Sequence, residues 1–155
     1  MVTDKYNRPV TSIRISITQR CNLDCIYCHR EGQGAESERE MTVDEIIRIL
    51  NLSTRFGINK VKYTGGEPLL REDLPEIIQE SHKITDIKDI SIVSNGILLE
   101  KYAQKLSKAG LDRINVTLDT LDPQLYADIT NHEGSLVDQV QNGIKAALNA
   151  GIKVI

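Results

Sequence analysis

The chain has 155 residues, of which 40% are hydrophobic and 4% aromatic, with no tryptophan, so we expect one soluble domain with an aliphatic core. The formal net charge is −3 with both signs interspersed, which excludes a basic surface for nucleic acid and a polybasic patch for a membrane. No apolar run approaches the about 20 residues that cross a bilayer. The three cysteines are clustered like metal ligands, which favours a reducing, cytoplasmic location.

Strands are indicated by aliphatic residues that alternate with polar ones. After a polar lead-in of eleven residues, Ile13, Ile15 and Ile17 follow this period of two. The same kind of pattern predicts four more strands, at residues 61–64, 90–94, 114–119 and 151–155.

Helices are predicted between these strands. Thr42 and Glu45 form a T-x-x-E capping box at the start of the first helix. Asp73 is expected to cap the second helix in the same way. Apolar residues at helical spacing predict two more helices, at 98–109 and 135–150, and the charged stretch 29–40 is expected to be a mobile loop.

The alternation of strand and helix predicts an α/β fold with parallel strands and right-handed crossovers. The unit repeats about four and a half times, whereas a complete eightfold barrel takes about 250 residues. We therefore expect a partial TIM-like (βα) barrel with outer helices. Residues 1–155 would be the N-terminal portion of a longer protein.

All the cysteines lie in one short stretch, as Cys21, Cys25 and Cys28, with the spacing C-x3-C-x2-C. Three thiolates leave a four-iron cluster one ligand short, so one iron stays open to a substrate or cofactor. A zinc site is the alternative, with His29 as the nearest fourth ligand. A disulfide would leave an odd thiol and is the weaker interpretation.

The polar residues of the strands share one parity and should face the barrel interior. Arg14 and Lys62 belong to this set on neighbouring strands, and two converging cations suit a phosphate or a carboxylate. An open sheet whose polar face meets solvent is the alternative. The full inward set is Arg14, Ser16, Thr18, Lys62, Thr64, Ser91, Val93, Asn95, Asn115, Thr117 and Asp119.

The cysteine motif, with Tyr27 before the last cysteine, resembles the signature of the radical S-adenosylmethionine (SAM) enzymes. The resemblance implies a [4Fe-4S] cluster on Cys21, Cys25 and Cys28, with SAM on the open iron. A reduced cluster would cleave SAM to methionine and a 5′-deoxyadenosyl radical. The stretch 65–68, Gly-Gly-Glu-Pro, is similar to the family's SAM-binding motif. The implied cofactor-binding residues are Tyr27, Gly65, Gly66, Glu67, Asn95 and Thr117, and no catalytic residue is implied beyond the cluster ligands.

Within that family, the stretches 4–22, 62–71 and 114–119 resemble the GTP 3′,8-cyclases of molybdenum cofactor biosynthesis. This resemblance implies that Arg14 and Lys62 contact GTP, and that the enzyme is a lyase that abstracts hydrogen from the GTP ribose. It also implies an electron donor as partner, and a homodimer is a further hypothesis.

Departures from the cyclase pattern qualify this expectation. Those cyclases usually carry Arg at Lys62, Thr at Val93 and Ser at Thr117, and a second cysteine triad that binds guanine, for which this sequence has no cysteines. We therefore expect cluster and SAM binding but no cyclic product from this chain alone. The alternatives are another radical SAM enzyme, such as a peptide-modifying maturase, and a non-catalytic three-cysteine metal-binding domain.

Overall fold

The computed structural model describes residues 2–28 and 39–155. Most of the predicted loop at 29–40 therefore lies outside the described residues. The strands are β1 (Ser12–Thr18), β2 (Lys60–Gly65), β3 (Asp89–Ser94), β4 (Arg113–Val116) and β5 (Lys153–Val154). The helices are α1 (Val43–Thr54), the 3-10 turn η1 (Pro68–Leu70), α2 (Leu74–His82), α3 (Leu99–Ala109), α4 (Pro123–Thr130) and α5 (Leu136–Asn149).

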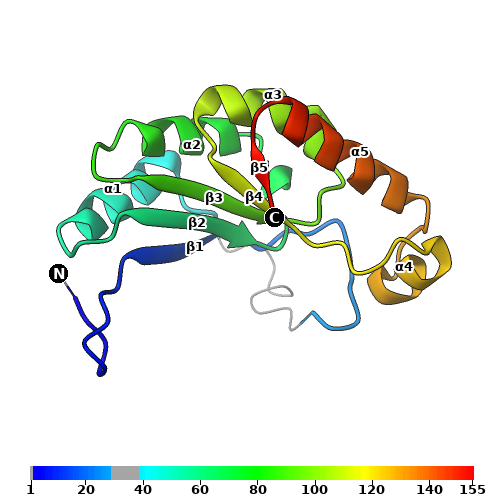
Figure 1. Cartoon of the computed structure of the whole chain (residues 1–155), viewed down its shortest axis with the longest axis horizontal. Helices are drawn as coiled ribbons and strands as arrows, with labels where there is room; N and C mark the ends of the chain where they lie inside the picture. The colour runs from blue at the N-terminus through cyan, green and yellow to red at the C-terminus, as the bar shows by residue number, and fades with distance from the viewer. Residues whose placement is uncertain (1, 29–38) are drawn as a thin grey trace.

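The five strands form one open parallel sheet in the order β1-β2-β3-β4-β5. Figure 1 shows α1, α2, α3 and α5 on one side of this sheet, while no helix of the described chain covers the other side. This arrangement confirms the predicted α/β class and the partial (βα) barrel of parallel strands with outer helices. None of the described helices has the length and apolarity needed to span a membrane.

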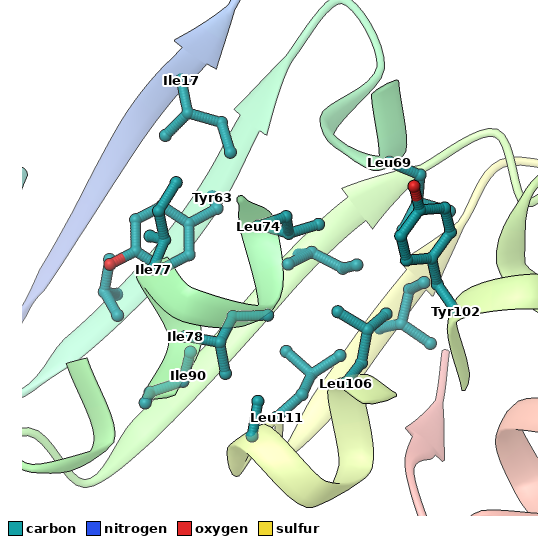
Figure 2. Close-up of a cluster of buried hydrophobic side chains, with 14 of the residues drawn as sticks. Ile17, Tyr63, Leu69, Leu74, Ile77, Ile78, Ile90, Tyr102, Leu106 and Leu111 are labelled. Carbon is teal, nitrogen blue, oxygen red and sulfur yellow. The ribbon is translucent and has the colours of Figure 1, made fainter. Parts of the chain in front are cut away.

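The apolar residues of predicted parity face the helices and make the core. Tyr63, Ile77 and Ile92 are fully buried there, on β2, α2 and β3. Figure 2 shows Tyr63 reaching from its strand toward α2, where its hydroxyl lies 2.6 Å from Ser81 Oγ. The core is therefore mainly aliphatic, and the buried hydroxyl of Tyr63 has a partner.

Helix α1 begins as predicted. The Glu45 amide donates to the Thr42 hydroxyl, and the Thr42 amide donates to the Glu45 carboxylate. At α2 the predicted start is right, but the predicted cap is wrong. Asp73 makes no capping hydrogen bond, because its carboxylate pairs with the Arg71 guanidinium at 2.8 Å instead.

Two further details differ from the sequence-based expectation. Strand β4 ends at Val116, so the strand predicted to 119 is too long; after Val116 the Thr117 amide donates to Ser94 O, and the chain leaves the sheet. Helix α4 was not predicted. Asp122 caps it by accepting from two amides at 2.8 and 3.0 Å, and Pro123 occupies its first turn, so a start signal was present in the sequence.

Candidate functional site

The carboxyl ends of the strands surround a cavity of about 150 Å³. Parallel strands end at the same edge of a sheet, which is where barrel enzymes carry their sites. Every predicted cluster ligand and cofactor-binding residue lines this cavity. The lining is Cys21, Leu23, Cys25, Tyr27, Cys28, Thr64, Gly65, Gly66, Glu67, Val93, Ser94, Asn95, Thr117, Asp119, Tyr126 and Thr130.

The glycine pair allows the end of β2 to pack directly against the backbone that leads into the cysteines. The Gly66 amide donates to Thr18 O at 2.9 Å, and the Glu67 amide donates to Arg20 O at 2.7 Å. A Cβ atom on Gly65 would lie 2.2 Å from Thr18 O, and one on Gly66 would lie 2.3 Å from Arg20 O. The two glycines therefore bring the cysteine loop and the Gly-Gly turn into contact, which no larger residue permits.

Glu67 is buried at 1% exposure and binds the protein itself. Its carboxylate accepts hydrogen bonds from the Leu69 amide at 2.9 Å, the Ser94 hydroxyl at 2.8 Å and the Asn95 amide at 2.7 Å. Burial raises the pKa of Glu67, while these three donors oppose that shift. The geometry makes Glu67 a clamp between the turn after β2 and the end of β3.

Asn95 extends this clamp to the cysteine loop. Its side-chain amide donates to Asn22 Oδ1 at 2.8 Å, and its own oxygen accepts from the Ile97 amide at 3.1 Å. The hydrogen-bonded path therefore runs from Glu67 through Asn95 to the residue that follows Cys21.

Tyr27 lies at the mouth of the cavity, about half exposed, and its hydroxyl donates to Asp119 Oδ2 at 2.8 Å. Desolvation raises the pKa of Tyr27 most, and the hydrogen bond to this carboxylate raises it further. The phenol therefore stays protonated at neutral pH and joins the cysteine loop to the segment after β4.

Helix α4 holds the opposite side of the cysteine loop. The Asp24 amide donates to Thr130 O at 3.1 Å, and the Ile26 amide donates to Ile129 O at 2.9 Å. The Asn131 side chain adds a bond to Asp24 O at 2.8 Å. Figure 1 shows this helix beyond the ends of the strands, beside the loop that it anchors.

The three thiols are presented to one cavity. Burial raises the pKa of Cys21 and of Cys25, so without metal both stay protonated at neutral pH, and binding a metal would displace their protons. Within the described residues, no three His, Cys, Asp or Glu side chains already converge on one point. A four-iron cluster takes each thiolate on a different iron and needs no such convergence, so this donor set fits it.

The two predicted substrate cations lie on the sheet face that no described helix covers. Arg14 and Lys62 are register partners on β1 and β2, as expected from their parity. Neither is among the residues that line the cavity, and Arg14 is exposed. Both side chains therefore lie on the face expected from their parity, while their predicted contact with a ligand stays a prediction.

Sequence reasoning missed several residues that build the site. Tyr126 and Thr130 come from the helix that was not predicted. Asn22 and Ser94 act through hydrogen bonds that join separate segments at the carboxyl ends of the strands. The Asp-Pro pair at 122–123 could have revealed the helix. Nothing in the sequence could have placed it against the cysteines.

The fold and the site together define a class: a parallel α/β domain with an open three-cysteine loop and a Gly-Gly turn at the carboxyl ends of its strands. A profile of the Radical SAM superfamily matches residues 15–155. The chain therefore belongs to the radical SAM superfamily, whose cofactors are a [4Fe-4S] cluster and SAM.

Curated relatives narrow the similarity. The chain is 56% identical over 154 residues to a probable GTP 3′,8-cyclase of Methanococcus aeolicus, covering 98% of this chain and 50% of the relative. It is 54% identical to the corresponding protein of Methanocaldococcus jannaschii, covering 96% and 49%. For Archaeoglobus fulgidus the identity is 47%, with 98% and 49% covered. The chain spans about half the length of the curated relatives that it matches.

Solved structures resemble the chain in fold. Streptococcus suis SuiB bound to S-adenosylmethionine gives a TM-score of 0.78 at 23% identity, covering 92% of this chain and 32% of SuiB. Methylornithine synthase gives a TM-score of 0.74 at 22% identity, covering 95% and 44%. At these identities the likeness concerns the fold alone.

Proposed function

We propose that this chain is the N-terminal, cluster-bearing part of a radical SAM GTP 3′,8-cyclase, with Cys21, Cys25 and Cys28 as cluster ligands. The observation that carries the proposal is the single cavity in which the three thiols meet the Gly-Gly turn. The relatives named as probable GTP 3′,8-cyclases support the choice of reaction.

The chain's own residues would hold and orient the cofactors. When bound and reduced, a cluster on these cysteines would supply one electron for the reductive cleavage of SAM to methionine and a 5′-deoxyadenosyl radical. Gly65 and Gly66 would offer backbone to SAM at close range, and Thr117 and Tyr27 line the same cavity. Glu67 and Asn95 would keep the Gly-Gly turn and the cysteine loop in register.

The cluster is tested by electron paramagnetic resonance of the anaerobically reconstituted, reduced chain, with and without SAM. We expect a cluster signal that shifts when SAM is added, and no such signal after Cys25→Ser. A cluster signal that does not change when SAM is added would contradict the proposal that this chain binds SAM. Zinc without iron or acid-labile sulfide would favour the non-catalytic metal-binding domain.

GTP is the substrate we propose, and Arg14 and Lys62 are its contacts on this chain. Equilibrium dialysis should show weaker GTP binding for Arg14→Ala and Lys62→Ala, because each removes a cation that faces the same side of the sheet. The matched control is Lys83→Ala, an exposed cation on the helix side whose pairing with Glu80 is local. Equal binding by all three variants would contradict the assignment.

The remaining features of the proposal concern the whole protein. An electron donor and a cytoplasmic setting follow from the redox chemistry, and the homodimer remains a hypothesis. The second cysteine triad of the cyclases, which binds guanine, would have to lie outside residues 1–155. Cyclic product formed from GTP by this chain alone would contradict the proposal that turnover needs a triad outside these residues.

A further inference from the structure

Tyr126 is a buried residue of the cavity wall that the proposed function does not use. It lies on α4, it is only 2% exposed, and it lines the cavity together with Cys25. Its hydroxyl is fully buried, yet among residues 2–28 and 39–155 it has no hydrogen-bond partner.

An unpaired buried hydroxyl calls for an explanation, because buried polar groups in native proteins are nearly always bonded. Phenylalanine would fill the same volume without this cost. The buried core tyrosine, Tyr63, shows the ordinary solution, with its hydroxyl 2.6 Å from Ser81 Oγ. Polar neighbours of Tyr126 at the cavity are also satisfied: Thr130 donates to Tyr126 O at 2.8 Å, and Glu67 accepts three bonds.

The hydroxyl has a proton that no described residue accepts, so it is free to donate to a group bound in the cavity. Tyr126 and Cys25 line the same cavity. Burial, with smaller contributions from Cys25 and Asp119, raises the pKa of Tyr126, so the phenol keeps its proton at neutral pH. The Asp119 carboxylate already accepts from Tyr27. A cluster held by Cys25 would add sulfur acceptors to the cavity that Tyr126 lines.

The backbone holds Tyr126 in a constant position relative to that ligand. Two hydrogen bonds join the end of α4 to the amides that flank Cys25, from Asp24 to Thr130 O and from Ile26 to Ile129 O. A donor and an acceptor that are fixed to each other in this way form a hydrogen bond with little further loss of entropy.

We propose that the Tyr126 hydroxyl donates a hydrogen bond to the sulfur shell of the cluster, at the Cys25 thiolate or an adjacent sulfide, and thereby raises the cluster's reduction potential. Hydrogen bonds to cluster sulfurs stabilise the more negative, reduced state. Tyr126 is thus a tuning residue that acts through a sulfur atom. The inference rests on the cluster assignment of the proposed function.

The test compares Tyr126→Phe with Tyr63→Phe, which removes a buried hydroxyl from the core without touching the cavity. In a mediated redox titration of the reconstituted chain, we expect Tyr126→Phe to lower the ratio of reduced to oxidised cluster at a fixed potential by about tenfold, equivalent to 59 mV for one electron. Tyr63→Phe should titrate like the parent. In deuterated buffer, electron–nuclear double resonance should show one exchangeable deuteron near the cluster in the parent and in Tyr63→Phe, and its loss in Tyr126→Phe.

The metal-free proteins provide an independent check. Without a cluster, Tyr126→Phe should be at least as stable as the parent toward denaturant, because it removes an unpaired buried hydroxyl, whereas Tyr63→Phe should be less stable.

Several results would overturn the proposal. Equal potentials and equal deuteron couplings in parent and Tyr126→Phe would do so. An effect that appears only with SAM bound would assign the hydroxyl to SAM instead. A cluster content below about a tenth of the parent's would also contradict the proposal, because it would assign the hydroxyl to cluster assembly instead of to the reduction potential. If the parent itself holds no cluster, the proposed function is wrong. If the parent holds a cluster but Tyr126→Phe has the same reduction potential and deuteron couplings, only this inference is wrong.

Discussion

The helix-covered face of the sheet and the rim at its carboxyl ends both contain buried residues, but of different kinds. The face is filled by aliphatic side chains such as Ile77, Ile78 and Ile90, which lie together between strand and helix (Figure 2). Of the seven buried polar residues in the described chain, five belong to the rim: Thr18, Glu67, Arg71, Ser94 and Thr130.

The difference teaches what each region tolerates. Packing of aliphatic groups is non-directional, so the face depends on volume and should accept hydrophobic replacements of similar size. The rim depends on individual hydrogen bonds and on backbone that approaches backbone at Gly65 and Gly66, so single atoms decide its geometry. Substitutions in the face should therefore lower the stability of the fold, and substitutions in the rim should impair cluster binding.

The largest change in stability is expected in the face. Ile77→Ala should lower the free energy of unfolding by about 2–5 kcal/mol, because it leaves a cavity beneath α2. Ile77→Leu, which nearly conserves volume, should cost less than about 1.5 kcal/mol. Denaturant titration of the metal-free chain measures both. An Ile77→Leu protein as unstable as Ile77→Ala would show that the face also depends on exact shape.

Gly66→Ala should lower the free energy of unfolding by about 1–3 kcal/mol, because its Cβ would lie 2.3 Å from Arg20 O. The substitution should also prevent cluster binding, because it would push the cysteine loop away. Iron and sulfide content after reconstitution is the measurement, and we expect less than about a tenth of the parent's.

The matched control for this prediction is Gly151→Ala. No atom lies within 4 Å of a Cβ there, and only a left-handed backbone conformation opposes it, at about 1 kcal/mol. Full cluster content in Gly66→Ala would refute the role assigned to this close approach.

Asp73→Asn tests the ion pair of the rim. Arg71 is almost fully buried and donates to Ile17 O, Met41 O and Asp73, so losing the carboxylate should cost about 1–2 kcal/mol at neutral pH, after discounting for the partly exposed Asp73.

The hydrogen bond from Arg71 lowers the pKa of Asp73 from 3.8. The pair's contribution is therefore fully present above pH 3.8, and it is lost as the pH falls through the lowered value. The stability gap between parent and Asp73→Asn, measured by denaturation from neutral to acidic pH, should close only below pH 3.8. A gap that is constant with pH would show that the cost has another origin.

The smallest effect is expected at the surface. Lys83→Ala breaks a solvent-exposed pair with Glu80 at the end of α2 and should change the free energy of unfolding by less than about 0.5 kcal/mol. Thermal and denaturant melts measure it. A loss above about 1 kcal/mol would mean that exposed charge matters to this fold as much as the rim does.

The sequence by itself was enough for the parallel α/β architecture, the capping box of α1 and the location of the chemistry. Period-two strands and period-3.6 helices are local patterns, and Cys21, Cys25 and Cys28 are close in sequence, so both can be read without knowing the fold.

Only the tertiary structure decided how the site is held together. The Asp73 carboxylate pairs with Arg71 instead of capping α2. Glu67 links the turn after β2 to the end of β3, and α4 packs against the cysteine loop. The contacts of Glu67 and of α4 join residues far apart in the sequence. Asp73 pairs with its near neighbour Arg71, whose guanidinium is also held by Ile17 O and Met41 O. A buried hydroxyl without a partner, such as that of Tyr126, becomes visible only when every atom around it has been placed.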